Sequence, residues 1–124
     1  MKNSKIKDDK WFMEQAYKEA LKAYKKNEVP IGAVIVKDGK IIARGHNERE
    51  LKQDATLHAE ITAIRKACKK LNSWRLNDCD IYVTLEPCAM CAGALIQSRI
   101  KTLYIGALDP RAGAAGSVID VFKI

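Results

Sequence analysis

The sequence predicts an α/β protein, a three-layer helix–sheet–helix sandwich with a mixed sheet. Strand-like and helix-like segments alternate after residue 57, which is typical of parallel strands joined by crossover helices. Earlier in the chain, an Asp38-Gly39 dipeptide stands between two apolar runs and is a strong signal for an antiparallel hairpin. A sheet that contains both kinds of pairing, with helices on both faces, accommodates both observations.

The first third of the chain is expected to form a helix and then the hairpin. Asp8 or Asp9 can cap a helix that runs to about Lys26. One stripe of this helix is expected to be buried, formed by Met13, Ala16, Ala20 and Tyr24. The apolar runs 31–36 and 40–44 are then the two strands of the hairpin.

The remaining elements follow from apolar periodicity and from turn residues. The pattern predicts, in order, a helix, a strand, a helix and a strand over residues 57–71, 79–85, 87–97 and 101–107. Pro87 suits the first turn of the second of these helices. The small-residue segment 109–117 follows the last strand, and loops at the carboxyl ends of strands in α/β sheets are frequent ligand sites.

Length, charge and hydropathy narrow the class of protein. The 124 residues suit one domain over residues 1–124, and the net charge of +7 suits phosphate-bearing partners. Lysines that only solvate helix faces explain the same excess. The longest apolar run, 31–36, is too short to cross a bilayer, and no apolar segment follows the charged N-terminus as in a secretory signal. We therefore expect a cytoplasmic protein with no membrane partner.

Three residues have the types and spacing of zinc ligands. Cys88 and Cys91 lie one turn apart at the predicted start of a helix, and His58 lies near the start of another. A structural zinc site usually has four protein ligands, whereas a catalytic site has three and leaves one position for water. Cys-x-x-Cys alone is also a redox motif, and His-x-Glu alone is weak evidence. Together and in this order they resemble the zinc-dependent nucleobase deaminases.

Glu60 is the carboxylate that the sequence places beside these ligands. A zinc ion lowers the pKa of its water, and a base is then needed to take the proton. We expect Glu60 to move this proton to a ring nitrogen and later to departing ammonia. A carboxylate in this position is also favoured by the helix dipole, so a purely structural role stays open.

Other notable side chains have simpler interpretations. Cys68 and Cys79 fit no metal spacing and are expected to be buried thiols. His46, taken alone, is expected to be structural. The aromatic residues expected to pack in the core or at its edge are Trp11, Trp74 and Tyr82.

Four stretches carry a family resemblance that extends from about Trp11 to the last residue. They are GHN at 45–47, TLHAEI at 56–61, VTLEPCAMCAGA at 83–94 and GAAGS at 113–117. These stretches resemble the bacterial tRNA-specific adenosine deaminases, a family of the zinc-dependent cytidine and deoxycytidylate deaminase superfamily. The last two stretches separate this family from other zinc deaminases.

The resemblance implies a cytidine-deaminase-like fold, one Zn²⁺ per chain, a homodimer, and hydrolytic deamination of the wobble adenosine of a tRNA anticodon to inosine. It also implies that Asn47 and the Ala59 backbone contact the flipped base and that Val29 and Pro30 form the wall of the pocket. Asp109 would face the target ribose. Members of the family continue for a few tens of residues beyond the equivalent of residue 124. The resemblance therefore implies a C-terminally shortened form that lacks the last strand and helix of the family.

Besides deamination of adenosine in RNA, two other functions remain open, and the RNA deaminase itself has a second candidate substrate. Single-stranded DNA is a further candidate substrate for an RNA adenosine deaminase. The same scaffold could instead deaminate guanine or cytosine as a free base or nucleotide. The chain could also be an inactive zinc-stabilised remnant, in which Cys79 or Glu60 completes the coordination shell. The basic first two thirds of the chain and the 113–117 stretch favour an RNA substrate.

Overall fold

The computed structural model describes residues 7–123, and its helices and strands follow the predicted order. In chain order they are α1 (Asp9–Lys25), β1 (Gly32–Lys37), β2 (Lys40–His46), α2 (Arg49–Lys52), α3 (Ala59–Leu71), β3 (Cys79–Leu85), α4 (Ala89–Gln97), β4 (Thr102–Ala107) and the 3-10 turn η1 (Val121–Lys123). The predicted strand over residues 79–85 coincides with β3. The short helix α2 was not predicted.

The four strands form one mixed sheet in the order β2-β1-β3-β4. Strand β1 is antiparallel to both β2 and β3, whereas β3 and β4 are parallel. The predicted hairpin is confirmed: Asp38 and Gly39 form its turn with positive φ angles of 52° and 76°. The mixed sheet that the sequence predicts is therefore present.

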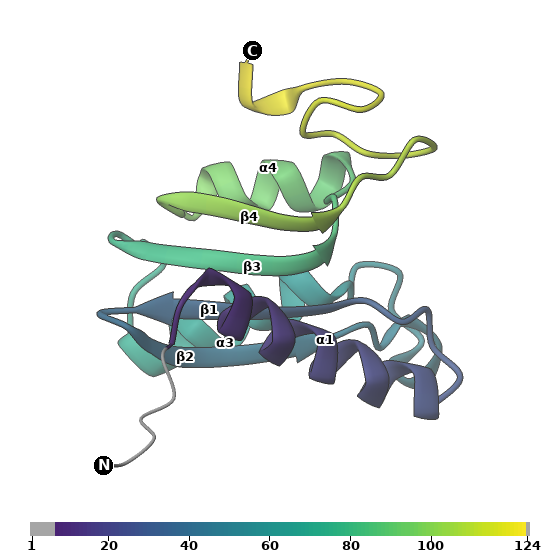
Figure 1. Ribbon diagram of the computed structural model, residues 1–124, viewed down its shortest axis with the longest axis horizontal. Helices are drawn as coiled ribbons and strands as arrows, with labels where there is room; N and C mark the ends of the chain where they lie inside the picture. The colour runs from purple at the N-terminus through teal and green to yellow at the C-terminus, as the bar shows by residue number, and fades with distance from the viewer. Residues whose placement is uncertain (1–6, 124) are drawn as a thin grey trace.

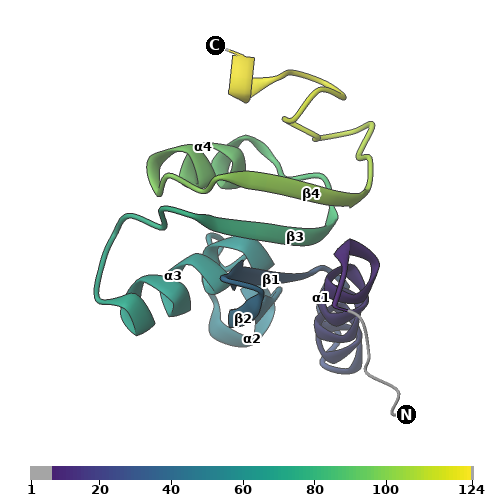
Figure 2. The ribbon, with the colours of Figure 1, turned by 60° about the vertical axis from the view of Figure 1, so that its left-hand side comes forward.

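Helices cover both faces of this sheet, which confirms the predicted three-layer sandwich. Figure 2 shows α1 on one side of the sheet and α3 and α4 on the other. Successive side chains of a strand point to opposite faces. Accordingly, Val34 and Tyr82 are buried with α1, while Ile35 and Ile81 are buried in the larger core beneath α3 and α4. The strand order is visible in Figure 1.

Two glycines let the helices approach the sheet closely. A Cβ atom on Gly32 would lie 2.1 Å from the carbonyl oxygen of Ala16 in α1. On the other face, a Cβ atom on Gly45 would lie 2.5 Å from the carbonyl oxygen of Ala59 in α3. Both glycines lie at the end of the sheet where the candidate site is found, at the start of β1 and the end of β2. The backbones of α1 and α3 therefore pack closely against the two faces of the sheet at this end.

Details of the three long predicted helices need correction. Tyr24 is 67% exposed and Met13 is only half-buried, so the predicted buried stripe of α1 is partly wrong. The buried face of α1 consists of Phe12, Gln15, Ala16, Glu19, Ala20 and Ala23. Helix α3 begins at Ala59 rather than at residue 57, and Pro87 precedes α4 rather than lying in its first turn.

Among residues 7–123, no helix is long and apolar enough to cross a membrane.

Candidate metal centre

The candidate site lies at one edge of the sheet, where four segments meet. Gly32 at the start of β1 pairs with His46 at the end of β2, and Leu85 at the end of β3 pairs with Ala107 at the end of β4. Because β1 runs antiparallel to its neighbours, its start lies at the edge where the other three strands end. Helices α3 and α4 both begin in this region. The topology thus brings several loops and two helix N-termini together.

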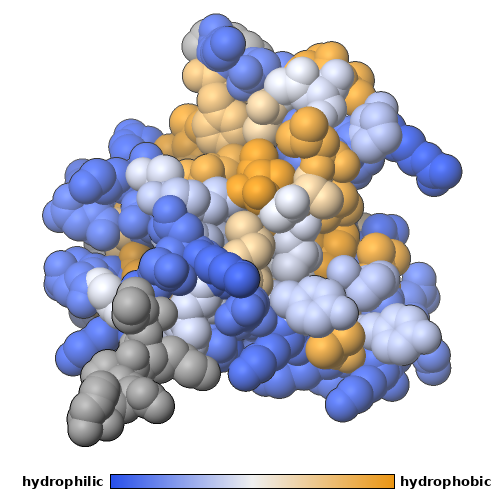
Figure 3. Space-filling model, viewed as in Figure 1, coloured by the Kyte–Doolittle hydropathy of each residue, from blue (hydrophilic) through white to orange (hydrophobic). Residues whose placement is uncertain are grey.

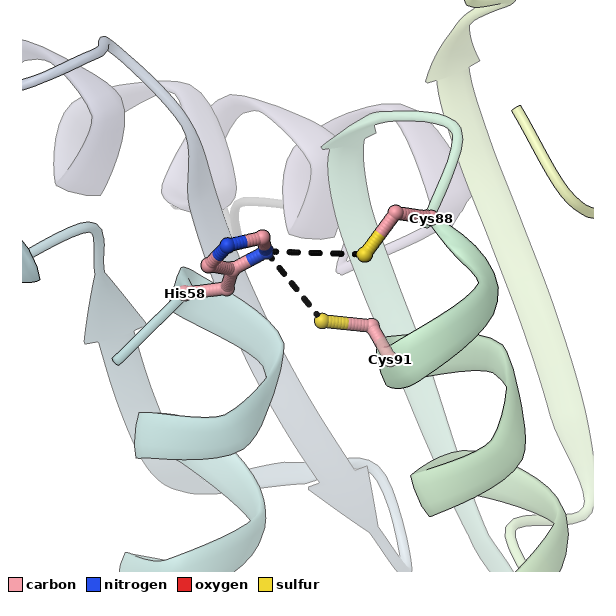
Figure 4. Close-up of side chains that lie close together, drawn as sticks. All are labelled: His58, Cys88 and Cys91. Carbon is pink, nitrogen blue, oxygen red and sulfur yellow. Dashed lines mark hydrogen bonds between the residues drawn. The ribbon is translucent and has the colours of Figure 1, made fainter. Parts of the chain in front are cut away.

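The three predicted ligands face one another across the gap between α3 and α4. Figure 4 shows His58 from the start of α3 turned toward Cys88 and Cys91 from the start of α4. The Sγ atoms of Cys88 and Cys91 each lie 3.6 Å from Nδ1 of His58. Their three candidate ligand atoms lie within 4.8 Å of one another.

Local backbone geometry explains this convergence. His58 and Cys88 are the N-cap residues of α3 and α4, each in an extended conformation with φ, ψ of −74°, 160° and −75°, 176°. An N-cap side chain ordinarily folds back to accept a hydrogen bond from the first turn, but neither residue makes that bond. Their side chains instead point outward into the shared gap.

The two thiols are electrostatically unequal. A hydrogen bond from Cys91 lowers the pKa of Cys88 to about 5, and backbone N–H groups at the start of α4 act in the same direction. The same interaction, together with burial, raises the pKa of Cys91. Cys88 is therefore the more acidic of the two thiols, at a helix N-terminus that favours negative charge.

Glu60 lies beside this group and is almost completely buried. Its side chain belongs to a residue that is 3% exposed, and within residues 7–123 its Oε1 atom has no hydrogen-bond partner. Burial raises the pKa of Glu60 to about 7, and negative charge on Cys88 acts in the same direction. Near neutral pH the protonated and ionised forms of such a carboxyl group are similarly populated. With one oxygen free, the group is suited to carrying protons.

The donor set fits a zinc ion. In a tetrahedral site with Zn–S near 2.3 Å and Zn–N near 2.0 Å, a sulfur and a nitrogen ligand are about 3.5 Å apart. The observed Sγ to Nδ1 distances of 3.6 Å match this spacing. No other His, Cys, Asp or Glu within residues 7–123 joins the group. In particular, Cys79 starts the seven-residue strand β3 and lies about 20 Å of strand length from the site.

Of the predicted substrate contacts, Asn47 and Ala59 adjoin the ligands. Ala59 is buried between His58 and Glu60 in the chain. Asn47 is 3% exposed, and its neighbour Glu48 donates a backbone hydrogen bond of 3.0 Å to the carbonyl of Leu57, next to His58. These two predicted contacts therefore lie at the same end of the strands as the candidate ligands.

Val29 and Pro30 lie on the adjoining segment before β1. The backbone N–H of Asn47 donates to the carbonyl of Ile31, which ties this segment to the end of β2. Both residues are exposed and line an apolar groove of about 600 Å³, together with Tyr24 and Leu85 among others. The segment that carries Val29 and Pro30 is thus joined to Asn47 through the backbone of Ile31.

Asp109 lies in the segment that follows β4. Its Oδ1 atom accepts backbone hydrogen bonds from Arg111 and Ala112 at 3.0 and 3.3 Å, which shapes the first turn of the segment. The segment then returns to the start of α4, where the N–H of Ala114 donates to the carbonyl of Pro87 at 2.9 Å. Asp109 is therefore attached to the element that carries Cys88.

Sequence reasoning missed three buried carboxylates that hold these loops. Glu28 accepts the backbone N–H groups of Glu50 and Leu51, at 3.1 and 2.6 Å, and so fixes the start of α2. Glu19 accepts from His46 Nδ1 at 3.0 Å, which supports the structural interpretation of His46. Glu86 anchors the segment after β4. For Glu28 and Glu86 the only local signal is a lone acid beside a turn or a strand end, and for Glu19, inside α1, there is none.

The remaining sequence interpretations have mixed outcomes. Cys79 is buried and Cys68 is half-buried, and both are free thiols, much as expected. Tyr82 is buried, and its hydroxyl contacts Asp9 at 2.5 Å. Trp74 is 55% exposed and lies near the guanidinium groups of two arginines, so the prediction that it packs in the core or at its edge fits poorly.

The fold and the ligand group define a class, and comparison with known families agrees. A family model described as MafB19-like deaminase matches residues 6–124, so the chain belongs to this deaminase family. Within it, the chain belongs with the tRNA-specific adenosine deaminases. It is 50% identical to the tRNA-specific adenosine deaminase of Bacillus subtilis over 93% of this chain and 71% of the relative. It is 55% identical to that of Rickettsia felis, over 90% of this chain and 78% of the relative.

Solved structures give the same result for the fold. A structure described in work on A-to-I editing by tRNA:A34 deaminases at the wobble position of transfer RNA superposes with a TM-score of 0.89. The two sequences are 51% identical, and the superposition covers 91% of this chain and 82% of the solved chain. A guanine deaminase from Bacillus subtilis gives a TM-score of 0.79 at 44% identity, over 82% of this chain and 65% of its own. The fold is therefore that of the nucleobase deaminases.

Proposed function

We propose that this chain deaminates adenosine to inosine by hydrolysis, at the wobble position of a tRNA anticodon. Water replaces the exocyclic amino group at C6 of adenine: a C–O bond forms, the C–N bond breaks, and ammonia leaves. The observation that carries the proposal is a His–Cys–Cys group beside a buried, unpartnered Glu60, in a chain half-identical to tRNA-specific adenosine deaminases. The net charge of +7 suits a polyanionic substrate.

We assign His58 Nδ1 and the sulfurs of Cys88 and Cys91 as ligands of one Zn²⁺. When bound, zinc supplies Lewis acidity that lowers the pKa of a water ligand toward neutrality. The protein contributes two thiolates at the N-terminus of α4, where unpaired N–H groups stabilise their charge. Two thiolates cancel the formal charge of the metal and so weaken its Lewis acidity. The reaction therefore depends strongly on a proton carrier, a group that takes the proton from water.

We assign Glu60 as that carrier. Its free Oε1 atom would take a proton from the attacking water, deliver it to a ring nitrogen of the base, and protonate the departing amine. Burial supports this role because it raises the pKa of Glu60 to about 7, so neither proton gain nor proton loss is strongly disfavoured.

We further assign the substrate contacts to the residues around this group. A base flipped out of the anticodon loop would meet the Asn47 side chain and the Ala59 backbone, with Val29 and Pro30 as the outer wall. The buried position of Asn47 and the apolar groove beside Val29 support this arrangement. Asp109 would accept a hydrogen bond from the 2′-hydroxyl of the target ribose, a group that DNA lacks. Single-stranded DNA would then be a poorer substrate than RNA.

A second chain is the proposed partner in solution. Met90, Ile96, Val118, Ile119 and Phe122 are exposed apolar residues of α4 and of the C-terminal segment. Figure 3 shows apolar side chains gathered over the part of the face where β4 and this segment lie. A homodimer that covers this surface would bury them. Because the assigned ligands are thiolates, we also place the protein in a reducing compartment, the cytoplasm.

A guanine deaminase is the one competing function that an observation favours, namely the 44% identity to such an enzyme. Zinc-loaded protein should be incubated separately with an anticodon hairpin, free adenine and free guanine. We expect A-to-I conversion in the hairpin by sequencing, with release of ammonia, and no ammonia from either free base. Ammonia from guanine alone would overturn the proposal in favour of the competing function.

A further inference from the structure

Glu86 is a buried carboxylate that the proposed chemistry does not use. It follows the last residue of β3, lies two residues before Cys88, and is 2% exposed. Its Oε1 atom accepts the backbone N–H of Asp109 at 3.0 Å, and its Oε2 atom accepts those of Ala115 and Ser117 at 2.9 and 3.1 Å. The hydroxyl of Ser117 also donates to Oε1. One side chain thus holds both ends of the segment 109–117.

The segment is fitted closely around this carboxylate. A Cβ atom on Gly113 would lie 2.4 Å from Cδ of Glu86, so no larger residue fits there without movement. The backbone adds two further ties, from Glu86 N–H to the carbonyl of Ala107 at 2.8 Å and from Ala114 N–H to that of Pro87 at 2.9 Å. The segment is therefore wrapped around the peptide that leads into Cys88.

The chemistry of these contacts requires an acid. All four partners of the carboxylate are donors, and no Lys or Arg within residues 7–123 forms an ion pair with it. An ionised carboxylate accepts at both oxygens, whereas an amide has one accepting oxygen and one donating nitrogen. A glutamine at this position would direct an NH₂ group at backbone N–H groups and lose one side of the anchor.

We propose that Glu86 is a positioning residue, which sets Asp109 and the 109–117 segment relative to the metal ligands. This inference rests on the proposed function, because that segment is assigned there to the target nucleotide. The segment is tied to the end of β3 by the Glu86 side chain and to the peptide before α4 by the N–H of Ala114. Loss of the anchor should then weaken nucleotide recognition while the ligand group stays intact.

Glu86→Gln tests this inference, with Glu14→Gln on the exposed face of α1 as the matched control. We expect Glu86→Gln to raise KM for the RNA hairpin by about tenfold or more, with a smaller change in kcat, and to keep one zinc per chain. The preference for RNA over a matched DNA hairpin should shrink. Unchanged KM and unchanged RNA preference would overturn the proposal.

A double-mutant cycle separates positioning from a merely structural role. If Glu86 acts through Asp109, then Asp109→Asn should raise KM strongly in the wild-type background and little in the Glu86→Gln background. Independent effects that multiply would contradict the inference. Should Glu86→Gln fail to fold, Ser117→Ala removes one of the four donors and gives the same cycle with smaller effects.

Hydrogen exchange keeps this test distinct from that of the proposed function. In zinc-loaded Glu86→Gln, the amides of Asp109, Ala115 and Ser117 should exchange about tenfold faster or more, while those of β1 stay unchanged. If these amides keep their protection, the positioning role is wrong, whatever the substrate. If protection is lost but wild-type protein leaves the hairpin unmodified, it is the proposed function that fails.

Discussion

The first turn of a helix has backbone N–H groups without partners in the helix, and α1 differs from α3 and α4 in how these groups are capped. Asp8 caps α1 in the usual way, with its carboxylate accepting the backbone N–H of Trp11 at 3.0 Å. At α3 and α4 the N-cap residues are His58 and Cys88, which leave the first turns without a side-chain cap. A good cap contributes about 1 kcal/mol to helix stability. Helices α3 and α4 lack this contribution, and their N-cap side chains contact each other instead.

This contrast shows how a group of candidate metal ligands can be built from ordinary helix starts. The extended backbone of an N-cap residue projects its side chain away from the helix, and two such residues on adjacent helices converge. The pKa of Cys88 is lowered first by the Cys91 side chain and further by backbone N–H groups in the first turn of α4. A candidate ligand in place of a capping residue thus supplies both the direction of the side chain and the electrostatic environment of the site.

The largest effect is expected when a ligand is replaced by a good capping residue. His58→Ser removes the imidazole and offers a hydroxyl that can cap α3, so it should abolish zinc binding and inosine formation without loss of the fold. Zinc content by atomic absorption and inosine by sequencing check this, with Cys68→Ala as a control that removes a thiol outside the ligand group. A serine variant that keeps one zinc per chain would show that His58 is not a ligand.

Loss of the proton carrier should be nearly as severe for turnover but should spare the metal. Glu60→Gln keeps the size of the side chain and removes its acid–base chemistry, so kcat should fall by at least about 100-fold while zinc content stays the same. Single-turnover deamination of the anticodon hairpin measures the change, with Glu14→Gln as the exposed control. Near-normal turnover in the glutamine variant would remove Glu60 from the mechanism.

Burial of Glu60 also predicts a pH dependence of stability in zinc-free protein. Because burial raises the folded-state pKa of Glu60 from 4.5 to about 7, the folded state binds the extra proton in that interval, and stability falls as pH rises through it. The loss should be on the order of 3 kcal/mol. Urea unfolding of zinc-free wild type and Glu60→Gln at pH 4 and pH 8 measures it. Parallel changes in the two proteins would contradict the predicted pKa.

The smallest effect belongs to the conventional cap. Asp8→Ala should lower the free energy of unfolding by about 1 kcal/mol, because the N–H of Trp11 loses its partner. Zinc content and kcat should stay at wild-type values, since α1 contributes no ligand. Thermal unfolding and the hairpin assay test both parts. A change in zinc content would break the contrast between this helix start and the other two.

The sequence predicted those features whose determinants are local. The hairpin depends on two adjacent turn residues, β3 on seven consecutive residues, and the ligand group on short spacings, so each could be read from a few positions. Tyr24 was misplaced because the buried face of α1 includes Glu19, whose partner His46 lies 27 residues away in the chain. Nothing in the local pattern of α1 indicates that an acid should be buried.

The loop anchors escaped prediction for the same reason. Glu86 and its donors are separated by 23 to 31 residues, and those donors are backbone groups that no sequence pattern marks. Helix α2 likewise depends on Glu28, which lies 22 residues before Glu50. His58 was expected inside the first turn of its helix, whereas its position as the N-cap is what turns its ring toward the two sulfurs.

X-ray absorption at the zinc edge of the loaded protein tests the central claim most directly, namely that two uncapped helix starts share one metal. The account predicts two sulfur ligands at about 2.3 Å, one imidazole nitrogen at about 2.0 Å and one further light atom. A sulfur count other than two, or a spectrum unchanged by His58→Ser, would contradict it.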